Sequence, residues 1–552
     1  MSRMLFQKSS QEFAIEAAVF VIAIAMLTIH VAVDVPNVID LFSPDGIVQS
    51  RTERQIQFVL AFAGIGGLII LTLQVAILFW LRRSSYWALK SGASLIQKQL
   101  RDSMPVILIL TVGICIAINI KDRSIDEWND ARGAEYVDIA TSIAAGHGFS
   151  YKEGDRWFWL DFSPETEHDA ETYYATAIEE PIYPYILAAS IGFFGNKGVF
   201  ALVVLQFLSW VAACLLTYSL GRALFSPNVG LFSAIMLAWW PNAEHMVLGY
   251  LGPSPFALLI FTATAYLVTY KLKSDSSNWW IAATGVLLGL GTLTLASSQI
   301  FIPIASATLI INKGWTKPQS WGAGLLLALV AALVISPWTY RNWSTFGEFV
   351  PVRTGMGLIS HQGNPTLAGS FMPGPHVCSD TLGPFWTAKS IPDAMHQATT
   401  EQAKEIAIYK RSFECIAQNA PSDYEEYNEP QRDAFYLQQA KKFIYEYPWT
   451  FAKMAYYKYL TAIKGQEAGR ATTVFGFLCL IGMAICLVQR KAIVLVAMIL
   501  AYFAPYALGI PWGYRYRFPI EPLVIIFGIY AVSAATDRLK NWWPFRQADT
   551  SI

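Results

Sequence analysis

Long apolar runs alternate with polar segments along the chain, and their lengths predict membrane-spanning helices. The first runs long enough to cross a bilayer lie at about 13–33, 56–81 and 104–120. Further spans are predicted at 197–221, 227–243, 251–272, 278–296, 299–312, 320–337, 471–488, 492–510 and 519–536. The run at 182–195 is too short for a span, so we interpret it as a re-entrant or interfacial helix. The pattern predicts an all-α polytopic membrane protein with about twelve transmembrane helices.

Two long polar loops divide this pattern into four parts. We expect an N-terminal extension with two transmembrane helices at 1–102 and a transmembrane core at 103–337. The core contains the first outer loop, residues 121–196, and is followed by the second outer loop, residues 338–470. The C-terminal helices and a short tail occupy 471–552.

The distribution of basic residues predicts which side of the membrane each loop faces. The linker RRSSYWALKSGASLIQKQLR, between the second and third spans, is rich in Arg and Lys and is therefore placed in the cytoplasm. Alternation from this linker places both long loops on the non-cytoplasmic side. It also places eight further basic positions in the cytoplasm: Lys271, Lys273, Lys313, Lys317, Arg490, Lys491, Arg538 and Lys540.

Composition supports the membrane prediction and narrows the partners. Charged residues make up 14% of the chain, against about 25% in soluble domains, and 54% of residues are hydrophobic. The 40 basic residues balance the 40 acidic residues, so nucleic acid is not an expected partner.

The apolar run at 13–33 exceeds the h-region of a signal peptide and is expected to remain as an anchor. Cys378 and Cys415 both fall in the second outer loop, where they either form a disulfide or stay as two thiols.

The second outer loop contains a helical pattern at 436–463. Pro448 divides this pattern into two expected helices. Because Tyr and Trp alternate with Lys there, we interpret the segment as lying on the membrane surface, with contact to a lipid substrate as the alternative.

Acidic residues concentrate in the first outer loop. Residues 121–185 contain fifteen Asp and Glu against five Lys and Arg. Carboxylates beside a bilayer are costly unless they face water or bind something, and one of them can act as a general base. The candidates, in our order of preference, are Asp130, Glu135, Asp126 and Glu127. The alternative for each is a solvated acidic surface.

Three arginines lie on the outer side, against the positive-inside bias. Arg515 and Arg517 precede the last span, and Arg341 follows the span at 320–337. A guanidinium suits a lipid phosphate and stays charged at every accessible pH. The alternative is pairing with lipid headgroups or with nearby Glu521.

Other candidate chemistry is sparse. Glu244 and His245 fall in a short outer turn and are expected to line the same cavity as the arginines. The outer histidines lack the spacing of zinc ligands, and we predict no metal site from them. No P-loop or dinucleotide fingerprint is present, so a nucleotide cofactor is not expected.

Four stretches in three parts of the chain together resemble a known family. EYVDIATSIAAGHGFS and EEPIYPYILAASIGFFG lie in the first outer loop, SPWTYRNWSTFGEFVPVRTGMGLISHQGNP begins the second, and RYRFPIEP precedes the last span. They resemble polyprenyl-phosphate-sugar-dependent glycosyltransferases of the GT-C fold, in the branch of bacterial protein mannosyltransferase-like and lipid A aminoarabinose transferase-like enzymes. The resemblance covers roughly 104–536 and leaves the first hundred residues unmatched.

The resemblance implies a GT-C-like fold with two large outer loops above a cavity at membrane level. It implies a carboxylate of the first loop as base and basic residues on the lipid phosphate. Within the matching segments, Glu180, Tyr183 and His361 become candidate substrate-binding residues.

We therefore predict a glycosyltransferase that moves a sugar from a polyprenyl-phosphate carrier to a glycan, lipid or protein acceptor, with inversion. The expected location is a bacterial inner membrane with the site facing the periplasm or cell exterior. No soluble cofactor is required, and the need for a divalent metal stays open. A lipid-linked sugar transporter or flippase is one alternative; a noncatalytic component of an envelope polysaccharide complex is another. Carriers place their charges inside the spans, whereas this chain places them in its outer loops.

Overall fold

The computed structural model describes residues 133–152, 172–240, 243, 245–366, 420–464, 470–509 and 514–542. The predicted spans at 13–33, 56–81 and 104–120 lie outside these residues, as do Cys378 and Cys415. The division into four parts is likewise not tested. Within the described residues, the prediction of an all-α polytopic membrane protein is confirmed.

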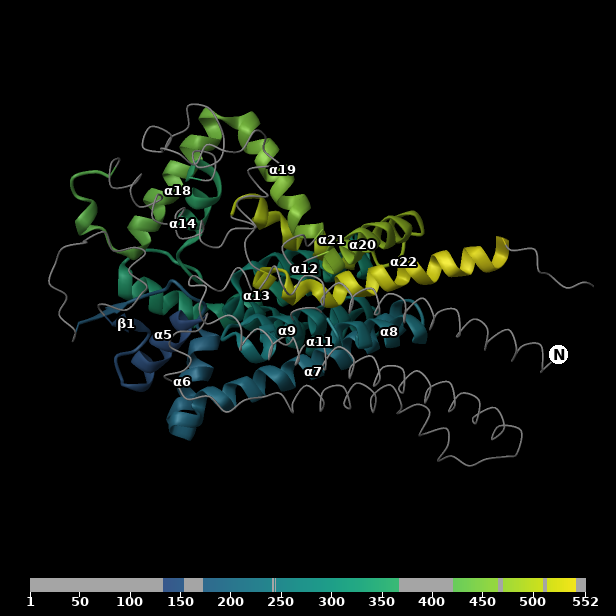
Figure 1. The fold of residues 1–552 in the computed structure, drawn as a ribbon, viewed down its shortest axis with the longest axis horizontal. Helices are drawn as coiled ribbons and strands as arrows, with labels where there is room; N and C mark the ends of the chain where they lie inside the picture. The colour runs from purple at the N-terminus through teal and green to yellow at the C-terminus, as the bar shows by residue number, and fades with distance from the viewer. Residues whose placement is uncertain are drawn as a thin grey trace, which may run out of the picture.

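Helices follow the predicted spans closely from residue 198 onward (Figure 1). They are α7 (Gly198–Leu224), α8 (Pro227–Ala238), α9 (Ser254–Tyr266), α11 (Asn278–Thr294), α12 (Phe301–Lys313), α13 (Pro318–Phe346), α20 (Arg470–Val488), α21 (Ile493–Phe503) and α22 (Glu521–Trp542). A π-helical segment, η4 (Leu267–Lys271), and the short α10 (Leu272–Ser274) extend α9.

Four helical segments among the described residues are long and apolar enough to cross a membrane by length and composition. They are 182–224, 254–274, 318–346 and 518–538. Shorter apolar helices occupy 227–238, 472–488 and 493–503. The total of about twelve spans therefore stays a prediction.

The segment predicted to be re-entrant or interfacial forms α6 (Ile182–Phe194). A 3₁₀ turn, η2 (Gly195–Lys197), separates it from α7. In Figure 1, α6 runs across the direction of α7, at the end of the bundle that carries α5 (Ala134–Ala144). The interpretation of this segment as re-entrant or interfacial stays a prediction.

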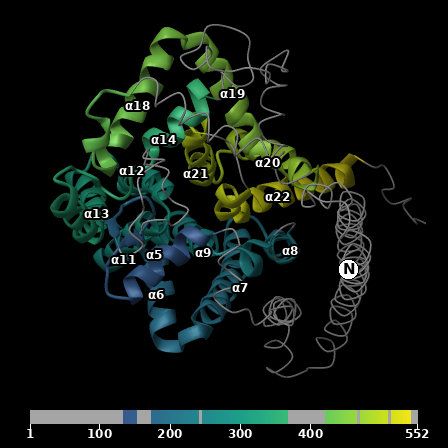
Figure 2. The same ribbon diagram turned by 60° about the vertical axis from the view of Figure 1, so that its left-hand side comes forward.

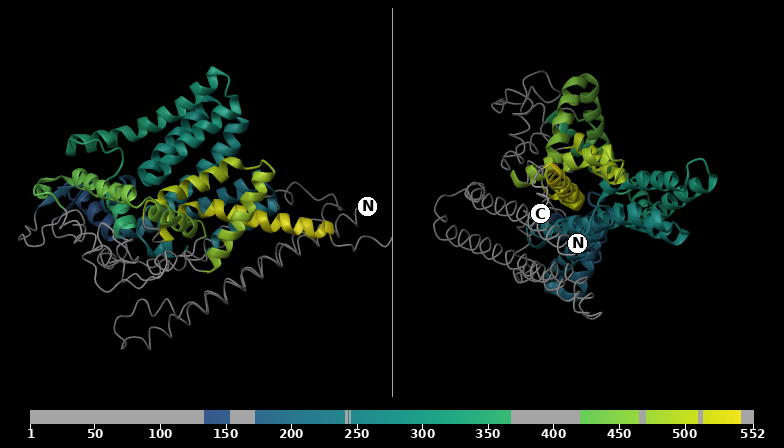
Figure 3. Two further views of the ribbon diagram at one scale, coloured as in Figure 1. Left: turned by 90° about the horizontal axis from the view of Figure 1, so that it is seen from above. Right: turned by 90° about the vertical axis from the view of Figure 1, so that its right-hand side faces the viewer.

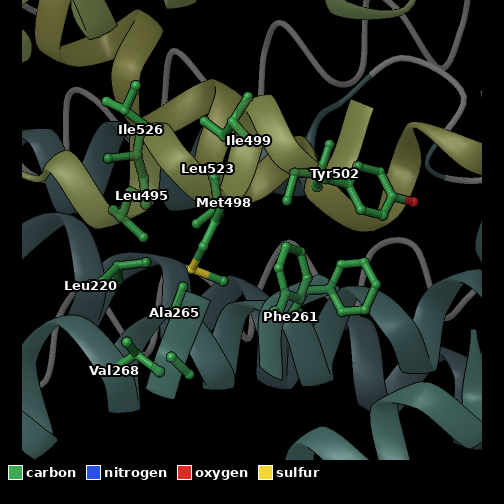
Figure 4. Packing of buried hydrophobic residues seen from close by; sticks show 14 of the residues in the cluster. Leu220, Phe261, Ala265, Val268, Leu495, Met498, Ile499, Tyr502, Leu523 and Ile526 are labelled. Carbon is green, nitrogen blue, oxygen red and sulfur yellow. The ribbon is translucent and has the colours of Figure 1, made fainter. Parts of the chain in front are cut away.

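The hydrophobic core lies between two groups of helices. Leu220 and Phe261 come from α7 and α9, and Met498 and Leu523 come from α21 and α22; all are buried. Figure 4 shows these side chains meeting across the interface between the teal and yellow helices. In Figure 3, α11, α12 and α13 form a teal-green group, and Leu288, Phe301 and Leu327 of these helices belong to the same core.

The outer loops are folded on one end of the bundle. From the first loop come α5 and an antiparallel pair of short strands, β1 (Ser150–Lys152) and β2 (Tyr173–Ala175). From the second come α14 (Met356–His361), η6 (Gln362–Thr366), α18 (Glu429–Glu446) and α19 (Pro448–Lys464). Figure 2 shows α18 and α19 arching above α14 and α21. The predicted break at Pro448 is confirmed.

One carboxylate joins the two outer loops. Glu429, in the first turn of α18, accepts hydrogen bonds from the Thr176 hydroxyl and the Ala177 amide of the first loop. The Thr354 hydroxyl of the second loop donates to the same carboxylate. Burial raises the pKa of Glu429, and these donors oppose the rise. The first loop is therefore fixed to α18 directly ahead of Glu179 and Glu180.

Candidate active site

Helix α5 begins where the backbone approaches another segment very closely. Gly133, at its N-cap, has φ of 105°, and an added Cβ would lie 2.0 Å from the carbonyl oxygen of Leu251. Only glycine tolerates both conditions. This contact sets the first turn of α5, and with it Glu135 and Tyr136, against the turn that carries Tyr250.

Glu135 is buried and faces an arginine. Its side chain is 5% exposed, and Oε1 lies 3.5 Å from Nη1 of Arg515. Burial raises the pKa of Glu135, and the positive charge of Arg515 opposes that rise. The position in the first turn of a helix also favours a negative charge.

Arg515 is held by aromatic residues and stays accessible. Nη1 donates to the Tyr250 hydroxyl at 2.7 Å, and Nη2 donates to the Tyr516 hydroxyl at 2.7 Å. The guanidinium carbon lies 4.7 Å from the centre of the Tyr516 ring. The side chain is 37% exposed despite these contacts. A fixed and partly open guanidinium can receive an anionic ligand.

Glu179 and Glu180 share a second arginine. Nη1 of Arg353 lies 3.2 Å from Oε2 of Glu179 and 3.3 Å from Oε2 of Glu180. Glu180 also accepts the backbone N–H of Ala296 at 2.8 Å. Burial, strengthened by Glu180 and Glu135 and opposed by Arg353, raises the pKa of Glu179 to about 7.

Tyr136 joins these two ion-pair groups, because it follows Glu135 in α5 and donates its hydroxyl to Oε2 of Glu179 at 3.1 Å. We call Glu135, Glu179, Glu180, Arg353 and Arg515 the charged cluster. Its two arginine side chains are 22% and 37% exposed, whereas its three glutamate side chains are 12% exposed or less. An anion that approaches the cluster therefore meets arginine first, with carboxylates behind it.

Arg341 is not part of the charged cluster. Its guanidinium donates to the carbonyl oxygens of Thr176 at 2.7 Å and Phe149 at 2.8 Å, and stacks 4.9 Å from the Trp338 ring centre. These bonds fasten the first outer loop to α13 at two points, directly before β1 and directly after β2. The observed contacts of Arg341 position the first loop, and its role toward a phosphate stays a prediction.

Arg517 also points away from the cluster. Nε donates to Oε1 of Glu521 at 2.6 Å, and Nη1 donates to the carbonyl oxygens of Ala462 and Ile463. The residue is 5% exposed, and Glu521 is fully buried. The pairing with Glu521, which the sequence offered as the alternative, is the one observed.

The remaining described candidates, Tyr183, His361 and His245, are not members of the charged cluster. The Tyr183 hydroxyl donates to Gln206, whose amide nitrogen donates to the carbonyl oxygens of Val247 and Tyr250. His361 is fully buried beside the Tyr436 ring, and burial lowers the pKa of His361 to about 3. His245 is exposed in the π-helical turn η3 (His245–Gly249).

Four candidates lie outside the described residues: Asp126, Glu127, Asp130 and Glu244. Their roles stay predictions. Among the described residues, no group of three or more His, Cys, Asp or Glu is placed to hold a metal ion.

Two central residues, Glu179 and Arg353, were not selected from the sequence. Both lie in segments that carry the family resemblance, in EEPIYPY and in FVPVRTG. Arg353 was also a further basic residue on the predicted outer side, which is the same signal that selected Arg341 and Arg515. Glu179 and Glu180 are adjacent residues of the same type, and they differ only in their contacts in the fold. The sequence does not reveal those contacts.

The comparisons with known proteins concern the same part of the chain. The sequence model of a family described as dolichyl-phosphate-mannose-protein mannosyltransferase matches residues 179–340. The match begins at the two glutamates of the cluster and ends directly before Arg341. A search of curated proteins found no match.

Two solved membrane proteins are similar in structure at low identity. The oligosaccharyltransferase of Archaeoglobus fulgidus with a tethered acceptor peptide is 12% identical, with a TM-score of 0.45 over 81% of this chain and 51% of its own. ArnT from Cupriavidus metallidurans bound to undecaprenyl phosphate is 14% identical, with a TM-score of 0.33 over 79% of each chain. The chain spans about half the length of the oligosaccharyltransferase. The family match confirms the resemblance predicted from the sequence over residues 179–340, where this chain is similar to the family described as dolichyl-phosphate-mannose-protein mannosyltransferase.

Proposed function

We propose that this protein is a membrane glycosyltransferase that moves a sugar from a polyprenyl-phosphate carrier to an acceptor on the non-cytoplasmic side. The observation that carries the proposal is the contact between Glu135 and Arg515, beside the pairing of Glu179 and Glu180 with Arg353. Carboxylates and partly exposed guanidinium groups meet there at one end of a bundle of apolar helices. The match to a family named for a polyprenyl-phosphate sugar supports this choice of donor.

The charged cluster suits a single displacement. The acceptor oxygen attacks the anomeric carbon, and its proton passes to a carboxylate of the first outer loop. The bond from the anomeric carbon to the phosphate oxygen breaks, and its electron pair stays on the phosphate. One displacement inverts the anomeric centre.

Arg515 has the contacts needed to stabilise the departing phosphate. Two tyrosine hydroxyls and Glu135 fix the orientation of its guanidinium before any ligand arrives. A preorganised positive charge stabilises developing negative charge without reorganising during the reaction. Its charge is also independent of pH across the physiological range.

The arrangement of turns supports the proposed sidedness. Helix α5, which carries Glu135, lies on the left of Figure 1 together with β1 and α6, and Arg515 meets Glu135 there. Lys313 donates to the carbonyl oxygen of Ser276, so the basic turns after α10 and α12 meet each other. Such turns are expected in the cytoplasm, and the opposite end of α9 contacts the Arg515 backbone through Ser254, which supports a non-cytoplasmic side for the charged cluster.

The test is sugar transfer by the full chain in proteoliposomes from a panel of undecaprenyl-phosphate sugars. Mass spectrometry of envelope glycolipids with and without the protein selects the sugar and acceptor. We expect Arg515→Ala to lower the transfer rate by about 10²–10³-fold, as the loss of one such donor does. Glu135→Gln and Asp130→Asn test the predicted bases.

Arg222→Ala is the matched control, because Arg222 is exposed in the last turn of α7, far along the helix from the cluster. Unchanged rates in all three site variants would contradict the assignment of the site. Potential-dependent uptake of a lipid-linked sugar without transfer would favour the transporter instead.

A further inference from the structure

The three carboxylates of the charged cluster are not equally available to a substrate. Glu180 uses both oxygens, because Arg353 contacts each of them and the Ala296 amide donates to Oε1. Glu135 is nearly enclosed at 5% exposure and pairs with Arg515.

Glu179 is the most accessible of the three. Its side chain is 12% exposed, and its contacts with Tyr136 and Arg353 both fall on Oε2. Oε1 accepts no hydrogen bond from the part of the chain that the structure describes. This oxygen is therefore placed to take a proton while Oε2 remains anchored.

We propose that Glu179 is the carboxylate that accepts the proton of the acceptor, and that this proton transfer releases Arg353 toward the departing phosphate. The inference rests on the proposed glycosyl transfer and names its base. It differs from the sequence-based preference for Asp130 and Glu135.

The balance of the step is simple. The O–H bond of the acceptor breaks and its proton goes to Oε1 of Glu179, while the acceptor oxygen bonds to the anomeric carbon. The bond from that carbon to the phosphate oxygen breaks, and the phosphate leaves with one more negative charge.

The charge of the cluster explains why proton transfer to Glu179 and departure of the phosphate favour each other. With three carboxylates and two guanidinium groups, the cluster has a formal charge of −1 before the reaction. A proton on Glu179 makes it neutral and weakens the pair with Arg353. The guanidinium of Arg353 therefore binds the phosphate more strongly at the moment when the phosphate gains negative charge.

The surroundings set the pH at which Glu179 can act. Glu135 on α5 and the adjacent Glu180 hold its pKa up, whereas Arg353 and Arg515 hold it down. The pKa of Glu179 of about 7 leaves a substantial fraction deprotonated at neutral pH. The transfer rate should therefore rise with pH through about 7 and then level off.

The closing experiment measures transfer against pH in proteoliposomes. We expect Glu179→Gln to lower kcat by about 10²–10⁴-fold, the range of general base catalysis, with a smaller change in KM. Tyr136→Phe removes a hydrogen bond to the charged form of Glu179, so we expect the rise in rate to move to higher pH with activity retained. Glu348→Gln is the matched control, because Glu348 is exposed on the same connection that carries Arg353.

A second measurement uses binding of undecaprenyl phosphate alone. If protonation of Glu179 releases Arg353, raising the pH from 6 to 8 should weaken binding to the wild type more than binding to Glu179→Gln. The difference should be about tenfold for a coupling of one pKa unit.

The outcomes separate the two proposals. Transfer by the wild type with an unchanged pH profile in Glu179→Gln and Tyr136→Phe would overturn the role of Glu179 alone. Absence of transfer from every lipid-phosphate sugar would overturn the proposed function and this inference with it.

Discussion

Arg515 and Arg517 stand two positions apart, in the same motif, and have opposite environments. Arg515 is 37% exposed beside Glu135, whereas Arg517 is 5% exposed and pairs with Glu521. Two 3₁₀ turns, η10 (Tyr514–Tyr516) and η11 (Phe518–Ile520), form this part of the chain. They place the two side chains in these separate surroundings. The first arginine is available to a ligand, and the second is committed to the fold.

We expect Arg517→Ala to destabilise the protein by about 3–5 kcal/mol, because it leaves Glu521 buried without its charge partner. Thermal unfolding in detergent, followed by tryptophan fluorescence, measures the change. Replacing both residues with Met should recover part of the loss. Arg538→Ala is the control, since Arg538 is exposed near the other end of α22. An Arg517→Ala protein as stable as this control would contradict the structural role.

The sequence predicted the kind of residues at the site better than their identity. Outer carboxylates and outer arginines were expected to meet, and Glu135 does lie beside Arg515. Periodicity and charge patterning could not separate Arg515 from Arg517, because pairing depends on contacts with α19 and α22. Arg353 was missed for the same reason: only the fold brings it across to Glu179.

At the scale of the elements, the apolar runs predicted where the helices lie. Each run is long enough to form a helix whose side chains are buried in the protein or face lipid. Local signals explain several boundaries. Ser226 caps α8 by accepting from the Val229 amide, and Asn428 forms a capping box with Gln431 at the start of α18. The apolar runs did not predict which helices pack against each other.

Helices α20 and α22 approach each other through a glycine. An added Cβ at Gly482 would lie 2.1 Å from the carbonyl oxygen of Phe527. Small residues of this kind let membrane helices pack backbone to backbone. We expect Gly482→Ala to cost about 1–3 kcal/mol by overpacking, measured as a lower melting temperature in detergent.

Gly322→Ala provides the matched comparison. A Cβ added at this exposed position of α13 would meet nothing within 4 Å. The two variants introduce the same methyl group into apolar helices, so equal melting temperatures would show that α20 and α22 do not pack this closely.

For the whole molecule, the predicted alternation of turns agrees with how the turns gather. Glu135 of the first outer loop meets Arg515 of the last outer turn in the charged cluster, and Lys313 donates to the carbonyl oxygen of Ser276, which joins two turns predicted to be cytoplasmic. The sequence could predict this because basic residues mark one set of turns. It could not show how closely the two outer loops interlock, since their contacts span more than 250 residues, as between Thr176 and Glu429.

Labelling of single cysteines tests the sidedness. Tyr445 on α18 is 83% exposed, and Trp315, between α12 and α13, is 68% exposed. In a background lacking Cys378 and Cys415, we expect Tyr445→Cys to react with a membrane-impermeant maleimide in spheroplasts. Trp315→Cys should react only after permeabilisation. The reverse result would place the charged cluster in the cytoplasm.

The bridge that Glu429 makes to Thr176, Ala177 and Thr354 has a practical consequence for chimeric proteins. The first loop of a relative could be grafted onto this chain in order to change the acceptor. Such a graft would replace Thr176 and Ala177, which donate hydrogen bonds to Glu429, with residues that need not fit this carboxylate. Segments 172–181, 349–361 and 428–433 therefore form one unit of exchange, and a swap that moves only one of them should yield a protein whose loops no longer fit together.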